Sequence, residues 1–473
     1  MSHLTARLRQ SGRIPSEPMT IPLAEGELQV QRWLRVLPGK RLVGHGELNG
    51  QPVLAKLFIA TGAERHWQRE SVGIQALQRS GLATPALLAS GELAGGGRYL
   101  LTEYLAGAHS LQQLWDQLPD RQPASSAAET ILRGALALIG RMHQQGLQQT
   151  DLHLGNFLQD SGELYVIDGD AIEVSEPGRP LSDAARLDNL GLFFAQLLPE
   201  WDQRTGELMT AYATSSSTRI DSAAVAASAG RWRQVRLQQF LDKTLRDCSQ
   251  FAVIHRPDRF VSVLRSEQEL LAPLLADPDS AFAGQPLLKD GGSSTVARVA
   301  LAGRELVVKR YNIKGASHWL KRFWRPSRAW HSWLAAWRLD FLGIATPRPL
   351  AMIERRIGPW RCQAWLISEY CPGQDLLRHL GEQGDRAPQG MEAEQLLKPF
   401  QQLQRGYISH GDFKATNLLW HAGRVVLIDL DAMQAHAGHA SWRRAWQRDR
   451  ARFIRNWPEG SSLRLWLQAN LPD

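Results

Sequence analysis

The sequence predicts an α+β protein of two tandem domains, each with a small β-rich N-terminal lobe and a mainly helical C-terminal lobe. The first observation is a triplet in which an Asp is followed five residues later by an Asn, and twelve residues after that by a second Asp. It occurs twice, displaced by 261 positions, as Asp151, Asn156, Asp168 and as Asp412, Asn417, Asp429. The second observation is a series of weaker matches in the same order in both halves. A duplicated domain explains both, and 473 residues are enough for two cores.

The weaker matches extend the repeat over most of both halves. They pair residues 53–56 with 306–309, 81–85 with 343–347, and 100–107 with 366–373. Their displacements drift between 253 and 266 positions, as loop insertions in a duplicated domain produce. We therefore predict a first domain over 20–272 and a second over 282–473, separated by a stretch with two prolines and two aspartates.

Each half begins with β-type segments and then becomes helical. Short β-type runs with Gly-rich turns predict N-terminal sheets at 27–59 and 286–311. Amphipathic helices follow at 64–80 and 327–342, and each ends at a Gly and then a Pro, which is a helix stop. Apolar runs predict strands at 98–104 and 363–370. A helix over 131–145 leads into the first triplet, short paired strands flank the second Asp, and helices at 187–198 and 443–456 are among those closing the halves.

Composition is that of a globular protein. Hydrophobic residues make up 43% of the chain and charged residues 22%, which suits two packed cores. The three cysteines form no disulfide framework or metal-binding spacing, and the first ten residues are polar, so we expect a reducing, cytoplasmic location. No apolar run approaches the length that spans a bilayer.

Positive charge and tryptophan are concentrated in the second half. Residues 277–473 carry 28 Lys and Arg against 18 Asp and Glu, whereas residues 1–276 carry 27 against 29. This indicates an anionic partner, and since no nucleic-acid motif accompanies the charge, we expect no nucleic acid. Between 442 and 457, arginines are interleaved with Trp442, Trp446 and Trp457. The pattern suits an anionic membrane surface, and a solvated helix face explains it equally well.

The spacing of the triplets is that of a phosphoryl-transfer site, so the predicted fold class is two tandem protein-kinase-like domains. Catalysis of this kind depends on positioning and charge stabilisation. Asp151 and Asp412 are the candidates that take up or orient the acceptor hydroxyl. The candidates for holding Mg²⁺ on the phosphates of ATP are Asn156, Asp168, Asn417 and Asp429. Any one of these residues is more simply a turn residue, but two complete triplets are not explained that way.

Residues upstream complete a nucleotide site in each half. Lys56 and Lys309 each end an apolar β-type run, as the phosphate-binding lysine of a kinase does. Glycines before them can present backbone N–H groups to phosphates, and the candidates are Gly44, Gly46, Gly291 and Gly292. In the repeated segments 100–107 and 366–373, the further candidates for nucleotide contact are Glu103 and Glu369.

The two halves differ at their nucleotide lysines. Glu70 lies on the first amphipathic helix, where it can pair with Lys56. The corresponding residue of the second half is Ser332, so Lys309 has no obvious carboxylate partner.

The loops that carry the triplets also differ. His410 precedes the second loop, and Gln149 stands at that position in the first. Lys414 gives the second loop a D-x-K-x-x-N form, whose lysine can neutralise the moving phosphoryl group. Asp170 and Asp431, two residues after each final Asp, can contact metal or substrate, or cap the next turn.

These motifs resemble the bacterial lipopolysaccharide kinase family, protein-kinase-like enzymes that phosphorylate heptose or Kdo sugars of the lipopolysaccharide inner core. The resemblance is strongest in V-V-K-R-Y-N at 307–312, G-I-A-T-P-R-P-L at 343–350, I-S-H-G-D-F-K-A-T-N at 408–417 and R-D-R-A-R-F-I-R-N-W at 448–457. It implies transfer from ATP, with Mg²⁺, to a sugar hydroxyl of a lipopolysaccharide core or lipid A precursor. It also implies action on the cytoplasmic side of the inner membrane, and the basic second half adds the expectation of peripheral binding to that anionic face.

Two other functions fit the same residues. One is a protein or small-metabolite kinase of the same fold, because the acceptor-binding residues are not legible in the sequence. The other is a single catalytic domain regulated by a pseudokinase partner domain. Two complete triplets argue against two inactive halves.

Overall fold

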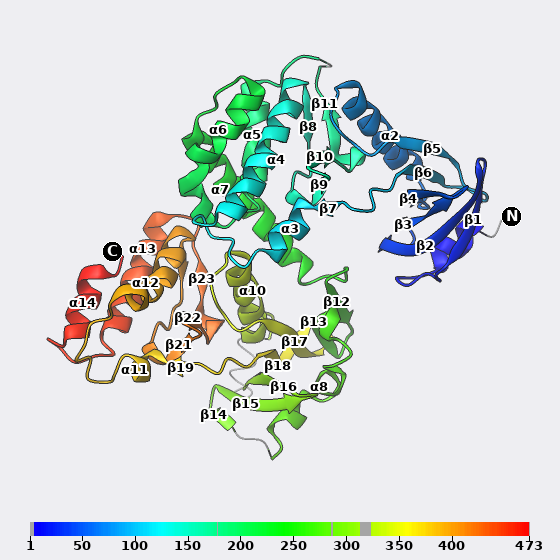
Figure 1. Ribbon diagram of the computed structural model, residues 1–473. Coiled ribbons are helices and arrows are strands. Elements are labelled where there is room, and N and C mark those ends of the chain that lie inside the picture. The colour runs from blue at the N-terminus through cyan, green and yellow to red at the C-terminus, as the bar shows by residue number, and fades with distance from the viewer. Residues whose placement is uncertain (1–3, 177, 285–286, 313–322, 473) are drawn as a thin grey trace. The chain divides into compact units, whose positions relative to one another are not determined.

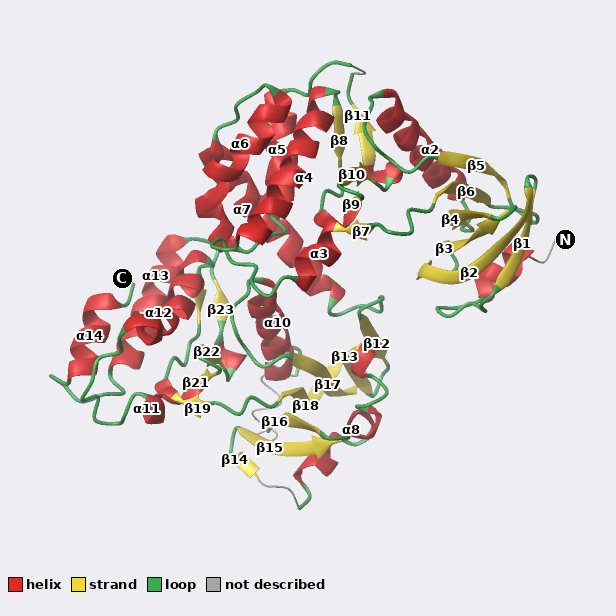
Figure 2. Cartoon of the chain, in the orientation of Figure 1, coloured by secondary structure: helices red, strands yellow, loops and turns green. Residues whose placement is uncertain are grey.

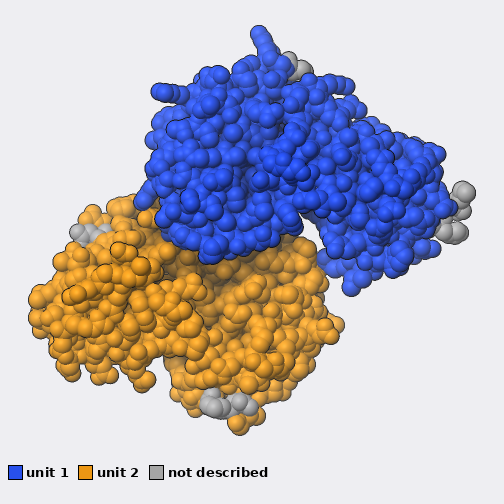
Figure 3. All heavy atoms as spheres, viewed as in Figure 1, with its two compact units in different colours: residues 1–234 blue, residues 235–473 orange. Residues whose placement is uncertain are grey.

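The chain forms two compact units in the structure, a computed structural model that describes residues 4–176, 178–284, 287–312 and 323–472 (Figures 1 and 3). Unit 1 comprises residues 1–234 and unit 2 residues 235–473. The division falls inside α7 (Ser222–Lys243), well before the predicted boundary between 20–272 and 282–473. The reason is that β12 (Phe251–His255) and β13 (Arg259–Leu264) belong to the second sheet, where β13 pairs antiparallel with β17 (Pro349–Ile357).

Each unit begins with one antiparallel sheet (Figure 2). In unit 1 the strand order is β1-β2-β3-β4-β6-β5, and α1 (Leu4–Gln10) packs against the sheet. The strands are β1 (Met19–Leu23), β2 (Gly26–Leu37), β3 (Arg41–Leu48), β4 (Gln51–Phe58), β5 (Leu87–Glu92) and β6 (Arg98–Glu103). In unit 2 the order is β12-β13-β17-β18-β16-β15-β14. The remaining strands there are β14 (Leu287–Gly291), β15 (Ser294–Leu301), β16 (Arg304–Tyr311) and β18 (Trp360–Glu369).

Alternation along the central strands positions the two lysines. On β4, Val53, Ala55 and Leu57 are buried in the core of the sheet. Because successive side chains of a strand point to opposite faces, Lys56 faces the other way. Lys309 of β16 alternates in the same manner with buried Val308.

Along the chain, a helix lies between strands of each sheet, near its predicted position: α2 (Ala63–Arg79) between β4 and β5 in unit 1, and α10 (Arg328–Phe341) between β16 and β17 in unit 2. The helical lobes come next. Unit 1 has α3 (Leu111–Gln117), α4 (Ser126–Gln144), α5 (Asp183–Phe194), α6 (Thr205–Ser216) and α7. Unit 2 has α11 (Leu376–His379), α12 (Gly390–Arg405), α13 (His439–Ile454) and α14 (Ser462–Asn470), and α8 (Ala272–Ala276) lies in the predicted boundary stretch.

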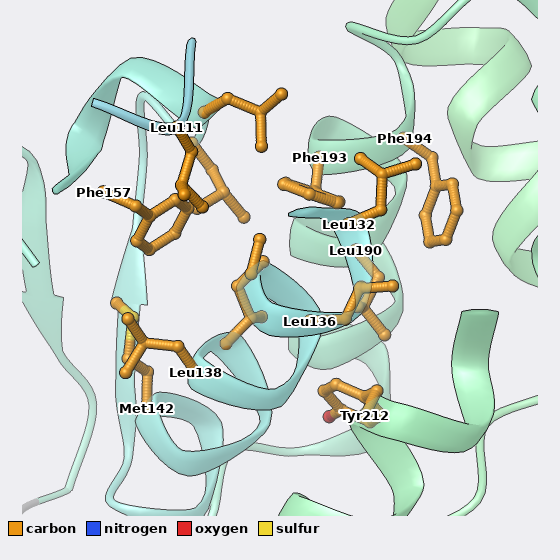
Figure 4. Packing of buried hydrophobic residues seen from close by; sticks show 14 of the residues in the cluster. Leu111, Leu132, Leu136, Leu138, Met142, Phe157, Leu190, Phe193, Phe194 and Tyr212 are labelled. Carbon is orange, nitrogen blue, oxygen red and sulfur yellow. The ribbon is translucent and has the colours of Figure 1, made fainter. Parts of the chain in front are cut away.

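The core of the first helical lobe is built around α4 (Figure 4). The Ser125 side chain caps the helix by accepting a hydrogen bond from the backbone of Ala128. Leu132 and Leu136 lie one turn apart on one face, and both are fully buried with Tyr212. This apolar face holds the loop that follows α4 at a defined place.

Short strands flank the final Asp of each triplet, as predicted, and others lie nearby. In unit 1 they are β7 (His109–Ser110), β8 (Leu147–Gln149), β9 (Phe157–Asp160), β10 (Glu163–Val166) and β11 (Ile172–Val174). In unit 2 they are β19 (Gln374–Asp375), β20 (Ile408–Ser409), β21 (Leu418–His421), β22 (Arg424–Leu427) and β23 (Gln434–Ala435). Within the described ranges, none of the helices combines the length and apolar character needed to cross a membrane.

Candidate active sites

Unit 1 contains a cavity of about 440 Å³ that gathers most of its predicted site residues. Its polar lining comes from both lobes and includes Lys56, Glu70, Glu103, Asp151, Asn156 and Asp168. Its apolar lining includes Val43, Leu54, Leu158 and Ile167. An apolar slot with a few convergent polar groups is the usual form of a small-molecule site. Arg35 and Arg41 also line the cavity, and the sequence patterns did not single them out.

Lys56 pairs with Glu70, as the sequence predicted. Glu70 is buried, and its carboxylate also accepts hydrogen bonds from the backbone N–H groups of Gly169 at 3.1 Å and Asp170 at 3.3 Å. The helix approaches this turn closely, since a Cβ on Gly73 would lie 2.1 Å from the carbonyl oxygen of Gly169. Glu70 therefore fixes the lysine and the turn after Asp168 together.

The loop of the first triplet is closed by its own Asn. The Nδ2 of Asn156 donates to the backbone oxygen of Asp151 at 2.8 Å. Asp168 adopts a left-handed φ of 69°, which is uncommon outside glycine and is found at functional turns. Its Oδ1 lies 4.0 Å from Lys56 Nζ, so the lysine and this carboxylate face the same space.

Unit 2 contains the corresponding cavity, of about 480 Å³. Its polar lining includes Lys309, Glu369, Asn417 and Asp429, and Lys289 adds a further positive charge. Its apolar lining includes Val296, Val307, Leu366, Leu419 and Ile428. Asp429 has a left-handed φ of 60°, and the Nδ2 of Asn417 donates to the backbone oxygen of Asp412 at 2.8 Å. Both features repeat those of the first site.

Lys309 has carboxylate partners that the sequence did not reveal. It forms ion pairs with Asp429 and, at 3.5 Å, with Asp431. The helix supplies none, as expected, because the hydroxyl of Ser332 lies 2.8 Å from that of Tyr311. Burial opposes the charge of Lys309, but Tyr311 and the two aspartates outweigh it and hold its pKa above the ordinary value.

The pKa values of the two aspartates in this turn are shifted in opposite directions. Burial disfavours the charge of Asp429, but hydrogen bonds from Asp431 and Lys309 hold its pKa far below the ordinary value. Burial and the hydrogen bond with Asp429 raise the pKa of Asp431. Arg328, at the start of α10, donates through Nε to Asp431 Oδ2 at 2.6 Å and through Nη1 to the Ser293 carbonyl at 3.0 Å. The arginine thereby ties the β14–β15 turn to the Asp431 turn.

Two cations hold the carboxylate of Asp412. Lys414 Nζ lies 3.0 Å from it, and Arg452 of α13 donates to Oδ1 at 2.7 Å. Burial raises the pKa of Asp412, but Lys414, Arg452 and Asn417 outweigh it and leave the pKa below the ordinary value. Asp412 is therefore a carboxylate at neutral pH. The role of Arg452 was not evident from the sequence, where it appeared only as part of an arginine-rich helix.

The loops are anchored to the strand before each final Asp. His410 Nε2 lies 3.0 Å from the carbonyl of Ile428, and Gln149 Nε2 donates to the carbonyl of Ile167 at 2.8 Å. Gln149 thus makes, in unit 1, the same hydrogen bond to the strand backbone that His410 makes in unit 2. In unit 2, Asp449 of α13 also accepts the backbone N–H of His410 at 2.7 Å.

The predicted glycine loops are only partly placed as expected. Gly44 and Gly46 lie inside β3 and do not line the cavity, so the prediction that they cover phosphates is wrong. These positions require glycine because β2 packs closely against them. A Cβ on Gly46 would lie 2.3 Å from the carbonyl oxygen of Gln29. Gly291 and Gly292 do lie at the turn between β14 and β15, although they are not in the cavity lining.

The proposed interfacial patch at 442–457 is also corrected. Trp442, Trp446 and Trp457 are at most 1% exposed and belong to the core of the second helical lobe. They cannot face lipid. The exposed arginines of this helix, Arg443, Arg444 and Arg448, are on the outside.

Two lobes, a strand lysine and a D-x-x-x-x-N loop in each unit define a protein-kinase-like protein. The lipopolysaccharide kinase (Kdo/WaaP) family model matches residues 53–178 and 281–457, and the chain belongs to this family. The lipopolysaccharide core heptose(I) kinase WaaP of Pseudomonas aeruginosa is 28% identical over 122 residues, which are 25% of this chain and 44% of that protein. The chain thus spans less than half of this curated relative.

Solved structures with a similar arrangement include two kinases. WaaP in complex with acyl carrier protein is 20% identical, with a TM-score of 0.34, over 44% of this chain and 89% of that one. The kinase domain of Mycobacterium tuberculosis PknI is 17% identical, with a TM-score of 0.29, over 46% of this chain and 99% of that one.

Proposed function

We propose that the chain is an ATP-dependent kinase that phosphorylates a sugar hydroxyl, of heptose or Kdo, in the lipopolysaccharide inner core. The observation that carries the proposal is that the family model matches both halves, and each half brings its lysine, Asn and final Asp to one cavity. The acceptor is a lipopolysaccharide core or lipid A precursor.

The residues of both sites fit Mg-ATP. Mg²⁺ is bound in kinases by one or two protein oxygens together with phosphate oxygens. Asn156 with Asp168, and Asn417 with Asp429, offer such oxygens at the cavity walls. When bound, the ion neutralises phosphate charge. Lys56 and Lys309 are placed to bind phosphate oxygens, and the apolar walls suit a nucleobase.

The residues proposed to act on the acceptor hydroxyl are more firmly held in unit 2 than in unit 1. There Asp412 is an oriented carboxylate that can take the proton of the acceptor hydroxyl, and Lys414 beside it can stabilise the transferring phosphoryl group. In unit 1 the corresponding Asp151 is 70% exposed, and His153 Nε2 lies 3.7 Å from it. We propose that Asp412 serves the principal transfer.

Mass spectrometry of lipopolysaccharide tests this function directly. A strain of the source organism that lacks this chain is expected to make a core without one of its phosphate groups. Expression of the chain from a plasmid should restore that group. A core of unchanged phosphate content would contradict the proposal, and an unchanged core with altered phosphoproteins would favour the protein-kinase alternative.

We also propose peripheral binding to the anionic cytoplasmic face of the inner membrane, through an aromatic cluster other than the one the sequence suggested. Trp324 and Trp360 are 58% and 45% exposed, and the ring of Phe323 contacts both, with centroid distances of 5.1 Å and 5.9 Å. Arg325 lies over Trp324. Exposed tryptophans beside basic residues suit the interface of an anionic bilayer.

Exchange of Trp324 and Trp360 for Ser is expected to weaken vesicle binding at least tenfold, because burial of even one aromatic ring contributes about 1.5–3 kcal/mol and about 1.4 kcal/mol corresponds to a factor of ten. Co-sedimentation with vesicles of rising anionic lipid content, at low and high salt, measures it. Leu465, 57% exposed on α14, provides the control variant Leu465→Ser. Equal losses for both variants, or binding that ignores lipid charge and salt, would refute this surface.

A further inference from the structure

Three arginines form a row along one face of α13. Arg444, Arg448 and Arg452 follow each other at intervals of four residues, which places them on the same side of the helix. At a rise of about 1.5 Å per residue, neighbouring positions in the row are about 6 Å apart along the axis. The row is long enough to contact groups on adjacent sugars.

One end of the row is at the candidate catalytic loop. Arg452 donates to Asp412 Oδ1 at 2.7 Å and to the Gly411 carbonyl at 3.1 Å. Asp449 of the same helix accepts the backbone N–H groups of His410 and Gly411. These contacts fix α13 against the loop, so the position of the row relative to Asp412 is defined.

The other end opens into a hollow of about 430 Å³ lined by His436, Ser441, Arg444, Ala445 and Arg448. Among the residues that the structure describes, no carboxylate lines it. His436 is held at its wall by a 2.8 Å hydrogen bond between Nε2 and the hydroxyl of Ser409, next to the catalytic loop.

Arg444 and Arg448 are exposed, and among the described residues neither has a hydrogen-bond or ion-pair partner. Two unpaired guanidinium groups in a hollow without acidic side chains are suited to one oxyanion, since each presents a planar fork of donors.

The arginine row belongs to unit 2 alone. The helix after the first triplet, α5, contains a single arginine, Arg186, which is buried and donates to the carbonyl of Leu181. Unit 1 therefore has no corresponding site on this helix, although the two nucleotide cavities are alike.

We propose that this hollow, formed by Arg444, Arg448 and His436, binds an oxyanion, phosphate or carboxylate, carried by the sugar acceptor. The inference rests on the proposed function and adds a substrate feature to it. The anionic group would lie roughly 6–12 Å from the reacting hydroxyl at Asp412, which is the distance of an adjacent sugar. The acceptor of unit 2 is thus a saccharide that already carries negative charge beside the residue to be phosphorylated.

Phenylglyoxal labelling of the intact chain, read by peptide mass spectrometry, tests the site without requiring activity. The reagent modifies accessible guanidinium groups. At inorganic phosphate near twice its dissociation constant, occupancy should slow labelling of Arg444 and Arg448 about threefold relative to sodium chloride of equal ionic strength. Arg443, exposed on the same helix but outside the hollow, is the internal control and should be labelled equally in both salts.

Kinetics provide the second test, with lipopolysaccharide from the deletion strain as acceptor. Exchange Arg448→Ala should raise the acceptor KM about 10- to 100-fold, as expected for a lost charged hydrogen bond, and leave kcat and the KM for ATP unchanged. Exchange Arg443→Ala should change none of them.

The outcomes separate the site from the function. Phosphate protection without any transfer to lipopolysaccharide would keep an oxyanion site and overturn the proposed kinase function. Transfer with equal KM values for the Arg448 and Arg443 variants, or equal protection of all three arginines, would overturn the site and keep the function.

Discussion

Exchange Asp412→Asn is expected to lower the rate of sugar phosphorylation by about 10²- to 10⁴-fold, because it removes the group that we propose accepts the hydroxyl proton. The pKa of Asp412 lies below the ordinary value, so the carboxylate stays ionised as the pH falls toward about 4, the usual pKa of an Asp. Asparagine retains the shape of the side chain and one acceptor oxygen, but it cannot take a proton. Single-turnover transfer from ATP to lipopolysaccharide measures the effect.

The fold should tolerate this change. The Asp412 side chain is 30% exposed in a polar loop, and the backbone around it is held independently by Asp449 and Asn417. The melting temperature is therefore expected to stay close to that of the unmodified chain. A large drop would mean that lost activity reflects unfolding, and the rate alone would then not support a catalytic role.

The matched control is Asp151→Asn in the same chain. If unit 2 performs the principal transfer, this variant should retain most of the activity of the intact chain. Loss with Asp151→Asn and retention with Asp412→Asn would assign transfer to unit 1. Full activity in the double variant would refute a catalytic role for either loop.

Local patterns were sufficient to predict the duplicated sites. The contact between Lys56 and Glu70 follows from a strand lysine and a helix carboxylate at a regular offset. The triplet spacing likewise reflects a short loop between two small strands, and such spacing changes little when the rest of a domain diverges. The arrangement of the candidate nucleotide site in unit 1 could therefore be predicted from short stretches of sequence.

The pairing of strands that are far apart in the sequence could not be predicted from local patterns. Strand β13 reads as a strand from its composition, but nothing local says that Arg259–Val263 pairs with residues 351–355 rather than with the first sheet. A boundary predicted from local sequence therefore falls at the next stretch rich in proline and aspartate. The sequence misassigns Gly44 and Gly46 to a phosphate-binding turn for a similar reason. A glycine required by the close approach of a neighbouring strand cannot be told from one required by a turn.

The tryptophans of α13 could have been placed from the sequence. Trp442 and Trp446 are four residues apart, and with Phe453 they form one helical face that is buried. The intervening arginines occupy the outer faces. Helical periodicity therefore separates the two residue types that appeared interleaved.

The exchange Asp431→Asn is expected to weaken nucleotide binding by unit 2 about 10- to 100-fold. It removes the carboxylate that can still form an ion pair with Lys309 when Asp429 binds the metal. In the first site Glu70 holds the lysine and leaves Asp168 as the candidate metal ligand. In the second site Ser332 cannot do so, and Asp429 is the candidate metal ligand. Asp431, 10% exposed and 3.5 Å from Lys309 Nζ, is the carboxylate that remains. Loss of one member of a buried charged pair is costly.

Binding of fluorescent ATP with Mg²⁺ to the full chain measures this effect. Exchange Lys56→Met in every sample silences the first site, so the signal comes from unit 2. The matched control is Asp170→Asn, because Asp170 occupies the corresponding position but pairs with Arg69 at 3.2 Å and not with the lysine. We expect it to leave binding by unit 2 unchanged.

The duplication also offers a rescue. Two residues after the lysine, unit 1 has Phe58 where unit 2 has Tyr311, whose hydroxyl contacts Ser332. Exchanges Ser332→Glu and Tyr311→Phe together copy the first arrangement into the second, so they should restore nucleotide affinity to the Asp431→Asn variant. Normal binding by Asp431→Asn alone would show that Asp429 suffices for Lys309. Weak binding that the paired exchanges do not restore, in a chain with an unchanged melting temperature, would mean that Asp431 acts mainly through Arg328 and the β14–β15 turn.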